Sequence, residues 1–174
     1  MLLSADASAL LLVDLQERLV PALHDGDAVV ANAGRLGRGA ALLDVPVHAT
    51  EQAPDKLGPT VAAIAPYPQL VVPKTLFGAA GFPTLLPPGA QEVVIAGAEA
   101  HVCVLQTVLG LLAARHRVVV VTDAVSSRTV ANRVAALDRM VRHGAELVTT
   151  EMVLFEWLRD AAHPRFREVQ ALIR

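Results

Sequence analysis

Short, continuous runs of apolar residues recur along this chain, and they constrain its fold more than any other feature. The clearest runs span residues 9–13, 45–49, 70–72, 93–96 and 118–121, and a weaker sixth spans residues 147–149. A strand with one wet face alternates apolar and polar residues, whereas the clearest of these runs are unbroken. Unbroken runs are typical of parallel strands that are covered on both faces. The chain is therefore predicted to build a sheet that is packed between two other layers.

Segments with helical spacing lie between these runs. We predict helices over residues 27–43, 102–115, 129–143, 151–160 and 164–173. Asp27 is suited to cap the first helix, Gly144 to end the third and Pro164 to begin the last. Strand and helix alternate along the chain, which predicts an α/β fold with a mostly parallel sheet and right-handed crossovers.

Composition narrows the class of protein further. A chain of 174 residues buries enough surface to fold on one core, so we expect a single domain over residues 1–174. Apolar residues make up 53% and charged residues 18%, a balance that excludes an unfolded chain. The net charge of −2 provides no basic footprint, so we expect no nucleic-acid partner. The single cysteine excludes an intrachain disulfide.

The chain shows no targeting or membrane signal. No basic residue precedes the first apolar run and Asp6 interrupts the segment before it, which argues against a secretory signal. The most apolar stretch, residues 102–114, is shorter than a bilayer span and contains Gln106 and Thr107. We expect a soluble, cytoplasmic protein without a membrane partner.

Ionisable side chains stand at the ends of three predicted strands, where ligands bind in open α/β sheets. Asp14 follows the first strand, Lys74 the third and Cys103 the fourth. Cys103 lies near the start of a predicted helix, whose partial positive charge would lower the pKa of the thiol. Lys74 would lower that pKa as well, and Asp14 could accept the thiol proton.

Each of these three residues also has a purely structural interpretation. A lone cysteine is more often a small buried apolar residue than a nucleophile. Asp14 can cap the turn after its strand, and Lys74 can be a solvated loop lysine. Lys74 is one of only two lysines among 15 basic residues, which is a weak hint of a special role. Position alone leaves both interpretations open.

Several segments carry a resemblance to a known family. In the segments ALLLVDLQ, VVPKTLFGAAGF and VIAGAEAHVCVLQT, this chain resembles the isochorismatase-like cysteine hydrolases. That family includes nicotinamidases and other small amidases. Family members of unassigned substrate are similar to it in HATEQAPDKLGPTV and TDAVSSRTVANRVAALDRM, and the resemblance covers nearly the whole chain. It implies a three-layer α/β/α fold with a six-stranded, mostly parallel sheet and Rossmann-like topology.

The resemblance also implies a catalytic triad of Asp14, Lys74 and Cys103. Cys103 would attack the carbonyl carbon of a small amide or related acyl substrate, while Asp14 would take the thiol proton and return it to the leaving amine. Lys74 would hold the thiolate, and water would hydrolyse the thioester. Backbone amides would bind the oxyanion, one from Cys103 and one just after a cis peptide bond between Ala98 and Glu99. Members of the family also form homo-oligomers, so we expect a dimer or a larger assembly.

Further residues beside these motifs have candidate roles. Glu99 would support the turn at the cis bond through its carboxylate. Gln16 would orient a loop or contact the substrate, and Phe77 would wall the substrate pocket or belong to the core. His101 invites a Cys–His dyad, but residues two apart on a helix do not face each other, so we do not assign one.

The chain departs from the nicotinamidases at their metal site. Those enzymes carry an aspartate and histidines after the second strand, where this chain has Thr50-Glu51-Gln52-Ala53-Pro54. Its six histidines are scattered singly, whereas zinc or iron needs clustered nitrogen or sulfur donors. We therefore expect no metal and no cofactor, and nicotinamide is not favoured as the substrate. Cys103 also argues against the vinyl-ether cleavage of true isochorismatases, which does not use the cysteine.

Two alternatives to a cysteine hydrolase follow from the sequence. One is a non-catalytic module of the same fold that binds or assembles, which a complete triad disfavours. The other is a nucleotide-binding domain, which needs a glycine-rich phosphate loop. The turns after the first and fourth strands, DLQER and GAEAH, supply no such loop. The first alternative stays open, and the second is set aside.

Overall fold

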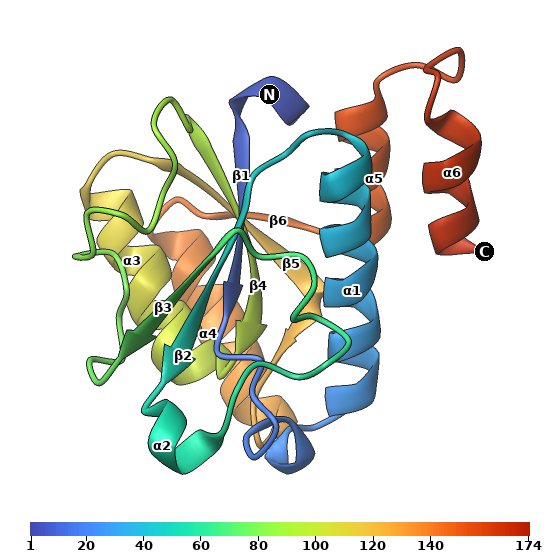
Figure 1. Cartoon of the computed structure of the whole chain (residues 1–174). Helices are drawn as coiled ribbons and strands as arrows, with labels where there is room; N and C mark the ends of the chain where they lie inside the picture. Colours follow the sequence, from blue (N-terminus) through green and yellow to red (C-terminus); the bar gives the residue numbers. More distant parts are fainter.

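Six strands form one sheet in the order β3-β2-β1-β4-β5-β6, in a computed structural model that describes all 174 residues (Figure 1). Every neighbouring pair of strands is parallel. The strands are β1 (Ser8–Val13), β2 (Val47–Gln52), β3 (Leu70–Lys74), β4 (Glu92–Ala98), β5 (Arg117–Ser126) and β6 (Glu146–Val148). Each overlaps one predicted apolar run, so the predicted six-stranded parallel sheet is confirmed.

Helices cover both faces of the sheet (Figure 1). On one face lie α1 (Gly26–Leu42), α5 (Thr150–Leu158) and α6 (Phe166–Gln170). On the other face lie α3 (Leu105–Ala113) and α4 (Val130–Arg142). The shorter helical turns are η1 (Ala5–Ala7), η2 (Val20–Ala22), α2 (Pro54–Leu57), the π-helical turn η3 (Ala100–Val104) and η4 (Ala171–Ile173). The three-layer α/β/α arrangement is confirmed, and no helix has the combined length and apolar character needed to cross a membrane.

The central strand β1 explains why the apolar runs are unbroken. All six of its residues are buried. Leu10 and Leu12 pack into the core beneath α1 and α5, while Leu11 and Val13 pack into the core beneath α3 and α4. Because successive side chains of a strand point to opposite faces, a strand between two helical layers needs apolar residues at every position.

Strand β5 is longer than predicted because its irregular second half is supported by another element. Ile95 of β4 pairs with Val120, but Gly97 pairs with Val125, so β5 bulges between the two pairs. The guanidinium of Arg133, on α4, donates to the carbonyl oxygens of Thr122 and Val125. An apolar run cannot reveal such a bulge, since its stability depends on a distant arginine.

Other predicted boundaries also shift, and two of these shifts lie at the carboxyl edge of the sheet. β2 continues through Glu51 and Gln52, because these residues pair with Pro73 and Lys74 of the edge strand β3. The helix predicted over residues 102–115 begins instead as the π-helical turn η3, and the regular helix α3 starts only at Leu105. Both shifts bring polar residues to the carboxyl edge of the sheet.

Gly97 allows β4 to approach β1 at that same edge. Its φ angle is +135°, and a Cβ atom built there would lie 2.1 Å from the carbonyl oxygen of Val13. No other residue fits this backbone conformation at such a distance. Val13 and Gly97 therefore form the last pair of the two strands, and Asp14 follows directly.

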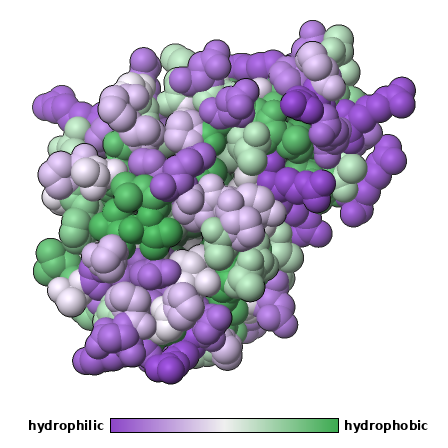
Figure 2. Space-filling model, viewed as in Figure 1, coloured by the Kyte–Doolittle hydropathy of each residue, from purple (hydrophilic) through white to green (hydrophobic).

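Apolar side chains also reach the surface. Figure 2 shows an apolar patch over the side where α3 lies in Figure 1. Several large apolar residues are more than a third exposed, among them Leu2, Leu76, Phe77, Val130, Val134, Val141, Met152 and Phe155. Leu76 and Phe77 belong to the loop that follows Lys74, so apolar surface extends close to the carboxyl edge of β3.

Candidate active site

The structure brings Asp14, Lys74 and Cys103 together at the carboxyl edge of the sheet. Asp14 follows β1, Lys74 is the last residue of β3, and Cys103 lies in η3 after β4. The Nζ atom of Lys74 donates to Oδ2 of Asp14 at 2.7 Å, and both side chains are completely buried. Cys103 is only 5% exposed.

The strand order explains why a lysine occupies position 74. β3 is separated from β1 by β2, so the backbones of β1 and β3 are about 10 Å apart. The long side chain of Lys74 extends past the end of β2 to reach the carboxylate of Asp14. A solvated loop lysine, the structural interpretation of Lys74, is therefore wrong.

The carboxylate of Asp14 is held at both oxygens. Oδ1 accepts a hydrogen bond from the Thr50 hydroxyl at 2.6 Å, and Oδ2 accepts from Lys74. The backbone of Asp14 has a φ angle of 49°, which is uncommon outside glycine, and its amide donates to the Thr50 carbonyl oxygen. A left-handed residue whose two carboxylate oxygens each accept a hydrogen bond orients that carboxylate firmly, and such conformations cluster at functional sites.

Gln52 is a residue of the site that the sequence did not identify. Its Oε1 atom accepts from Lys74 Nζ at 2.8 Å and lies 3.9 Å from Cys103 Sγ. Its Nε2 atom donates to the Thr75 carbonyl oxygen at 2.8 Å. The available signal was positional, because Gln52 ends β2 in register with Lys74.

Phe77 contributes its backbone to the site. Its carbonyl oxygen accepts the third hydrogen bond of Lys74 Nζ, at 3.1 Å. An ammonium has three N–H donors, so the bonds to Asp14, Gln52 and Phe77 use all of them. The Phe77 side chain is 52% exposed, so it does not belong to the core.

Burial dominates the acidity of the thiol. It raises the pKa of Cys103 from 9.0 to about 12, and the negative charge of Asp14 adds to the rise, while Lys74 opposes it. The prediction that the thiol pKa would be lowered is therefore wrong. The helix expected to lower it is a five-residue π-helical turn at this point, and desolvation of the thiolate outweighs the nearby ammonium.

The backbone before Cys103 turns at the position that the resemblance implies. The peptide bond between Ala98 and Glu99 is cis. The Glu99 carbonyl oxygen accepts from the amides of Val102 and Val104, and its carboxylate accepts from Arg128 at 2.8 Å. Glu99 thus ties the turn to the segment between β5 and α4.

Two candidate residues form their hydrogen bonds with groups other than the thiol. Gln16 is fully buried, and its amide group bonds only to backbone atoms of Gln52 and Gly58. It supports the end of β2 and has no free atom for a substrate, which corrects its place in the substrate pocket. His101 bonds to Ser127 at 3.0 Å and contacts Asn132, in agreement with our decision not to assign a Cys–His dyad.

The structure contains no cluster of three or more His, Cys, Asp or Glu side chains that could hold a metal ion. Two potential metal ligands on β2, a histidine and a glutamate, bond to other groups. His48 contacts the Leu85 carbonyl oxygen at 2.8 Å, and the Glu51 carboxylate accepts from the amide and hydroxyl of Thr60 at 2.7 Å. These donors do not fit a metal site of the nicotinamidase kind.

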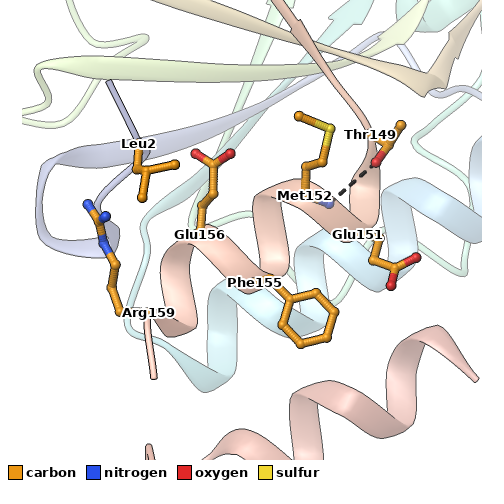
Figure 3. A pocket seen from close by; sticks show the side chains of 7 residues that line it. All are labelled: Leu2, Thr149, Glu151, Met152, Phe155, Glu156 and Arg159. Atoms are coloured by element: carbon orange, nitrogen blue, oxygen red, sulfur yellow. Dashed lines mark hydrogen bonds between the residues drawn. The ribbon is translucent and has the colours of Figure 1, made fainter. Parts of the chain in front are cut away.

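A groove of about 470 Å³ lies elsewhere on the molecule, along α5 (Figure 3). Figure 3 shows Leu2, from the N-terminal segment, beside Glu156, and the amide of Leu3 donates to that carboxylate. The lining residues are Leu2, Thr149, Glu151, Met152, Phe155, Glu156 and Arg159. None of the residues that surround the thiol contributes to this groove.

Comparisons with known sequences identify related proteins. A family model described as the Isochorismatase domain matches residues 8–152. Isochorismatase domain-containing protein 2A of Mus musculus is 40% identical, over 97% of this chain and 84% of the mouse protein. Isochorismatase domain-containing protein 1 of Salmo salar is also 40% identical, over 92% of this chain, which spans only 59% of the salmon protein.

Solved structures agree with these relatives. The MAR1 ribonuclease from Caenorhabditis elegans is 35% identical with a TM-score of 0.91, and the match covers 99% of this chain and 92% of that protein. YcaC from Pseudomonas aeruginosa, solved with hexane-2,5-diol and covalent acrylamide, is 26% identical with a TM-score of 0.91, over 99% and 90%. The YcaC gene product of Escherichia coli, described as an octameric hydrolase of unknown specificity, is 27% identical with a TM-score of 0.85, over 98% and 95%.

Proposed function

Because this chain belongs to the isochorismatase-domain family, we propose that it is a metal-independent hydrolase that cleaves small amides or related acyl compounds through a thioester on Cys103. The observation that carries this proposal is the buried Lys74–Asp14 ion pair beside the only cysteine of the chain. A base, a cation and a nucleophile thus meet where ligands of open α/β sheets bind.

The proposed cycle starts from the neutral thiol. As Sγ of Cys103 bonds to the carbonyl carbon, the thiol proton passes to the carboxylate of Asp14 and the carbonyl π electrons move to oxygen. The tetrahedral adduct then collapses, the C–N bond breaks, and the leaving amine takes the proton from Asp14, which leaves a thioester. Water attacks the thioester and gives a proton to Asp14. The second tetrahedral adduct collapses, the C–S bond breaks and releases the acid product, and the sulfur atom takes that proton back.

The raised thiol pKa supports this order of events. A thiol with a pKa of about 12 is almost entirely protonated near neutral pH, so a base must remove its proton as the new bond forms. Asp14 is the carboxylate that acts on this thiol, and Thr50 and Lys74 hold it in place. Lys74 lowers the thiol pKa, so it would favour the sulfur atom as it loses the proton.

We assign the oxyanion site to the backbone of η3 and of the turn that precedes it. The donors would be the amide of Cys103 and an amide just after the Ala98–Glu99 peptide. Donors of this kind stabilise the charge that develops on the carbonyl oxygen in the transition state. The ion pair of Glu99 with Arg128 supports the turn that presents them.

A non-catalytic binding or assembly module is the second candidate, and one observation favours it. A protonated thiol that is 5% exposed is a poor nucleophile until its proton is removed. The two candidates differ in turnover. We expect wild-type protein to release ammonia from members of a panel of small primary amides, and Cys103→Ser to lose several orders of magnitude of that activity. No turnover with any member of the panel would favour the second candidate.

Acrylamide belongs in that panel for two reasons. It is a small primary amide, and it also alkylates thiols. One structural neighbour, YcaC from Pseudomonas aeruginosa, holds covalent acrylamide. We expect acrylamide to modify Cys103. Prior alkylation of Cys103 by iodoacetamide should prevent this modification. A matched incubation of Cys103→Ser controls for modification at other residues.

Ribonuclease activity, the property named for the neighbour from Caenorhabditis elegans, is less favoured for this chain. The net charge is −2, and phosphate backbones are bound by clustered lysine and arginine. Single-stranded RNA incubated with the protein under the same conditions should stay intact. Its degradation by wild type but not by Cys103→Ser would overturn the choice of substrate class.

We further propose a cytoplasmic homo-oligomer that needs no metal and no cofactor. Exposed apolar residues such as Leu76, Phe77 and Val134 need cover from water, and patches of this kind usually mark contacts. The Escherichia coli neighbour is described as octameric. Light scattering should give at least twice the chain mass of 18.4 kDa at micromolar concentration. A particle of one chain would contradict the oligomer.

A further inference from the structure

We propose that Gln52 is a positioning residue that keeps the Cys103 thiol protonated at rest, because it occupies the N–H group of Lys74 that a thiolate would require. The inference deepens the proposed function, since it concerns the regulation of the same nucleophile. It rests on the hydrogen bonds around Lys74 and on the orientation of one amide.

The ammonium of Lys74 has no free N–H donor. Its three N–H donors are used by Asp14 Oδ2, Gln52 Oε1 and the Phe77 carbonyl oxygen, at 2.7, 2.8 and 3.1 Å. A thiolate at Cys103 gains a hydrogen bond from Lys74 only if one of these three acceptors gives up its own. Gln52 is the acceptor that lies beside the sulfur atom, at 3.9 Å.

The Gln52 amide presents its oxygen atom to Lys74 and Cys103. Its Nε2 atom donates to the Thr75 carbonyl oxygen, which directs Oε1 toward Lys74 and Cys103. Gln16 holds the Gln52 backbone from behind, through its carbonyl oxygen and its amide. The group that faces the sulfur atom is therefore an acceptor only. It receives an S–H proton, and it repels a thiolate.

Two charged groups influence the thiol. Asp14 and Lys74 act on it from β1 and β3. The other ionisable side chains nearby are engaged elsewhere, since Glu51 bonds to Thr60, Glu99 to Arg128 and His101 to Ser127. The balance between thiol and thiolate therefore depends on burial, on the charges of Asp14 and Lys74, and on the neutral oxygen of Gln52 beside the sulfur atom.

Opposite substitutions of Gln52 test the inference. Gln52→Leu removes the acceptor and frees one N–H of Lys74, so thiolate forms at a lower pH. Gln52→Glu places a negative charge beside the sulfur atom, so thiolate forms at a higher pH. The readout is the rate of iodoacetamide alkylation between pH 7 and pH 10, a range below the thiol pKa in which the rate follows the thiolate fraction. It is unambiguous because Cys103 is the only cysteine.

We expect the thiolate fraction of Gln52→Leu to rise at least about tenfold at a fixed pH, which corresponds to a fall of about one unit in the thiol pKa. The alkylation rate should then rise by about threefold or more, because a less basic thiolate is also a weaker nucleophile. Gln52→Glu should react more slowly than wild type at every pH. Gln91→Leu, the same substitution at an exposed glutamine before β4, should leave the profile unchanged.

The pattern of results separates this role from a structural one. If Gln52 only supports the fold, both variants loosen the site and both alkylate faster, which would overturn the inference. An unchanged alkylation rate in Gln52→Leu would overturn it as well. Neither readout requires turnover, so a protein without hydrolase activity would sink the proposed function and still leave this inference to be judged by alkylation.

Discussion

The ammonium of Lys74 lies 2.7 Å from the carboxylate of Asp14, although the two residues end strands that are separated by β2. Neither side chain is exposed to solvent. Two buried opposite charges are stable together and costly apart, because the partner that remains has no water to solvate it. The pair therefore links the placement of three strands to the electrostatics at Cys103.

Replacement of Lys74 by methionine tests that link. Lys74→Met keeps most of the side-chain volume but leaves Asp14 buried without its cation, so the free energy of unfolding should fall by about 3–5 kcal/mol. The Cys103 thiol loses the one group that lowers its pKa, so the pKa should rise further and alkylation should slow. Denaturant titration and iodoacetamide kinetics measure the two effects.

Asp14→Asn is the matched variant, because it removes the opposite charge of the same pair. Asp14 raises the pKa of the thiol, so its loss should speed alkylation while hydrolysis is abolished. Equal alkylation rates in wild type, Lys74→Met and Asp14→Asn would show that the pair does not act on Cys103.

The raised thiol pKa predicts how stability depends on pH. The folded thiol has a pKa of about 12, against 9.0 for a free thiol. Below pH 9 both states are protonated and the stabilisation is complete. Above pH 9 the unfolded chain loses its proton first, so stability falls by up to about 1.4 kcal/mol for each pH unit.

Cys103→Ser isolates this effect, since serine does not titrate in that range. Between pH 8 and pH 10.5, wild type should lose about 1–2 kcal/mol more than Cys103→Ser, as measured by denaturant unfolding. Parallel pH profiles for the two proteins would mean that the thiol is not held in its neutral form.

Gly97 should tolerate no side chain. A Cβ atom at this position would lie 2.1 Å from the Val13 carbonyl oxygen, and the backbone has a φ angle of +135°. Gly97→Ala should therefore destabilise the fold by at least about 2 kcal/mol. Gly81→Ala is the control, because a Cβ atom added there would meet nothing within 4 Å. A similar loss of stability in both variants would refute the close approach of β4 to β1.

Chelation tests the proposal that catalysis uses no metal. Hydrolase activity should survive dialysis against EDTA, and elemental analysis of the active protein should find less than one equivalent of zinc or iron. His48 and Glu51 are the first residues to replace if activity is lost and then restored by a metal, because they are potential metal ligands on β2, near the carboxyl edge of the sheet.

The fold could be predicted where the apolar residues of a single segment determine its structure. Unbroken runs such as β1 read as central strands because both of their faces are buried. The bulge of β5 could not be predicted, because it is supported by Arg133, which lies on α4. Gly97 was not singled out either, since its role depends on the distance to Val13 on a neighbouring strand.

The site was predictable in its ionisable members and not in Gln52. Asp14, Lys74 and Cys103 stand out at strand ends because a buried charge or a reactive thiol needs a reason. Gln52 has no charge, and its importance appears only when its oxygen is found between Lys74 and the sulfur atom. The thiol pKa was predicted in the wrong direction, because the degree of burial of Cys103 cannot be read from one sequence.

The central claim is that Cys103 forms an acyl intermediate, and intact-protein mass spectrometry tests it most directly. Wild-type protein is mixed with small amides, quenched in acid within the first turnovers and compared with Cys103→Ser treated in the same way. We predict a mass increase equal to the acyl group, mapped to Cys103 and removed by hydroxylamine, in wild type alone. Amide turnover with no adduct at any time, or equal turnover by Cys103→Ser, would contradict it.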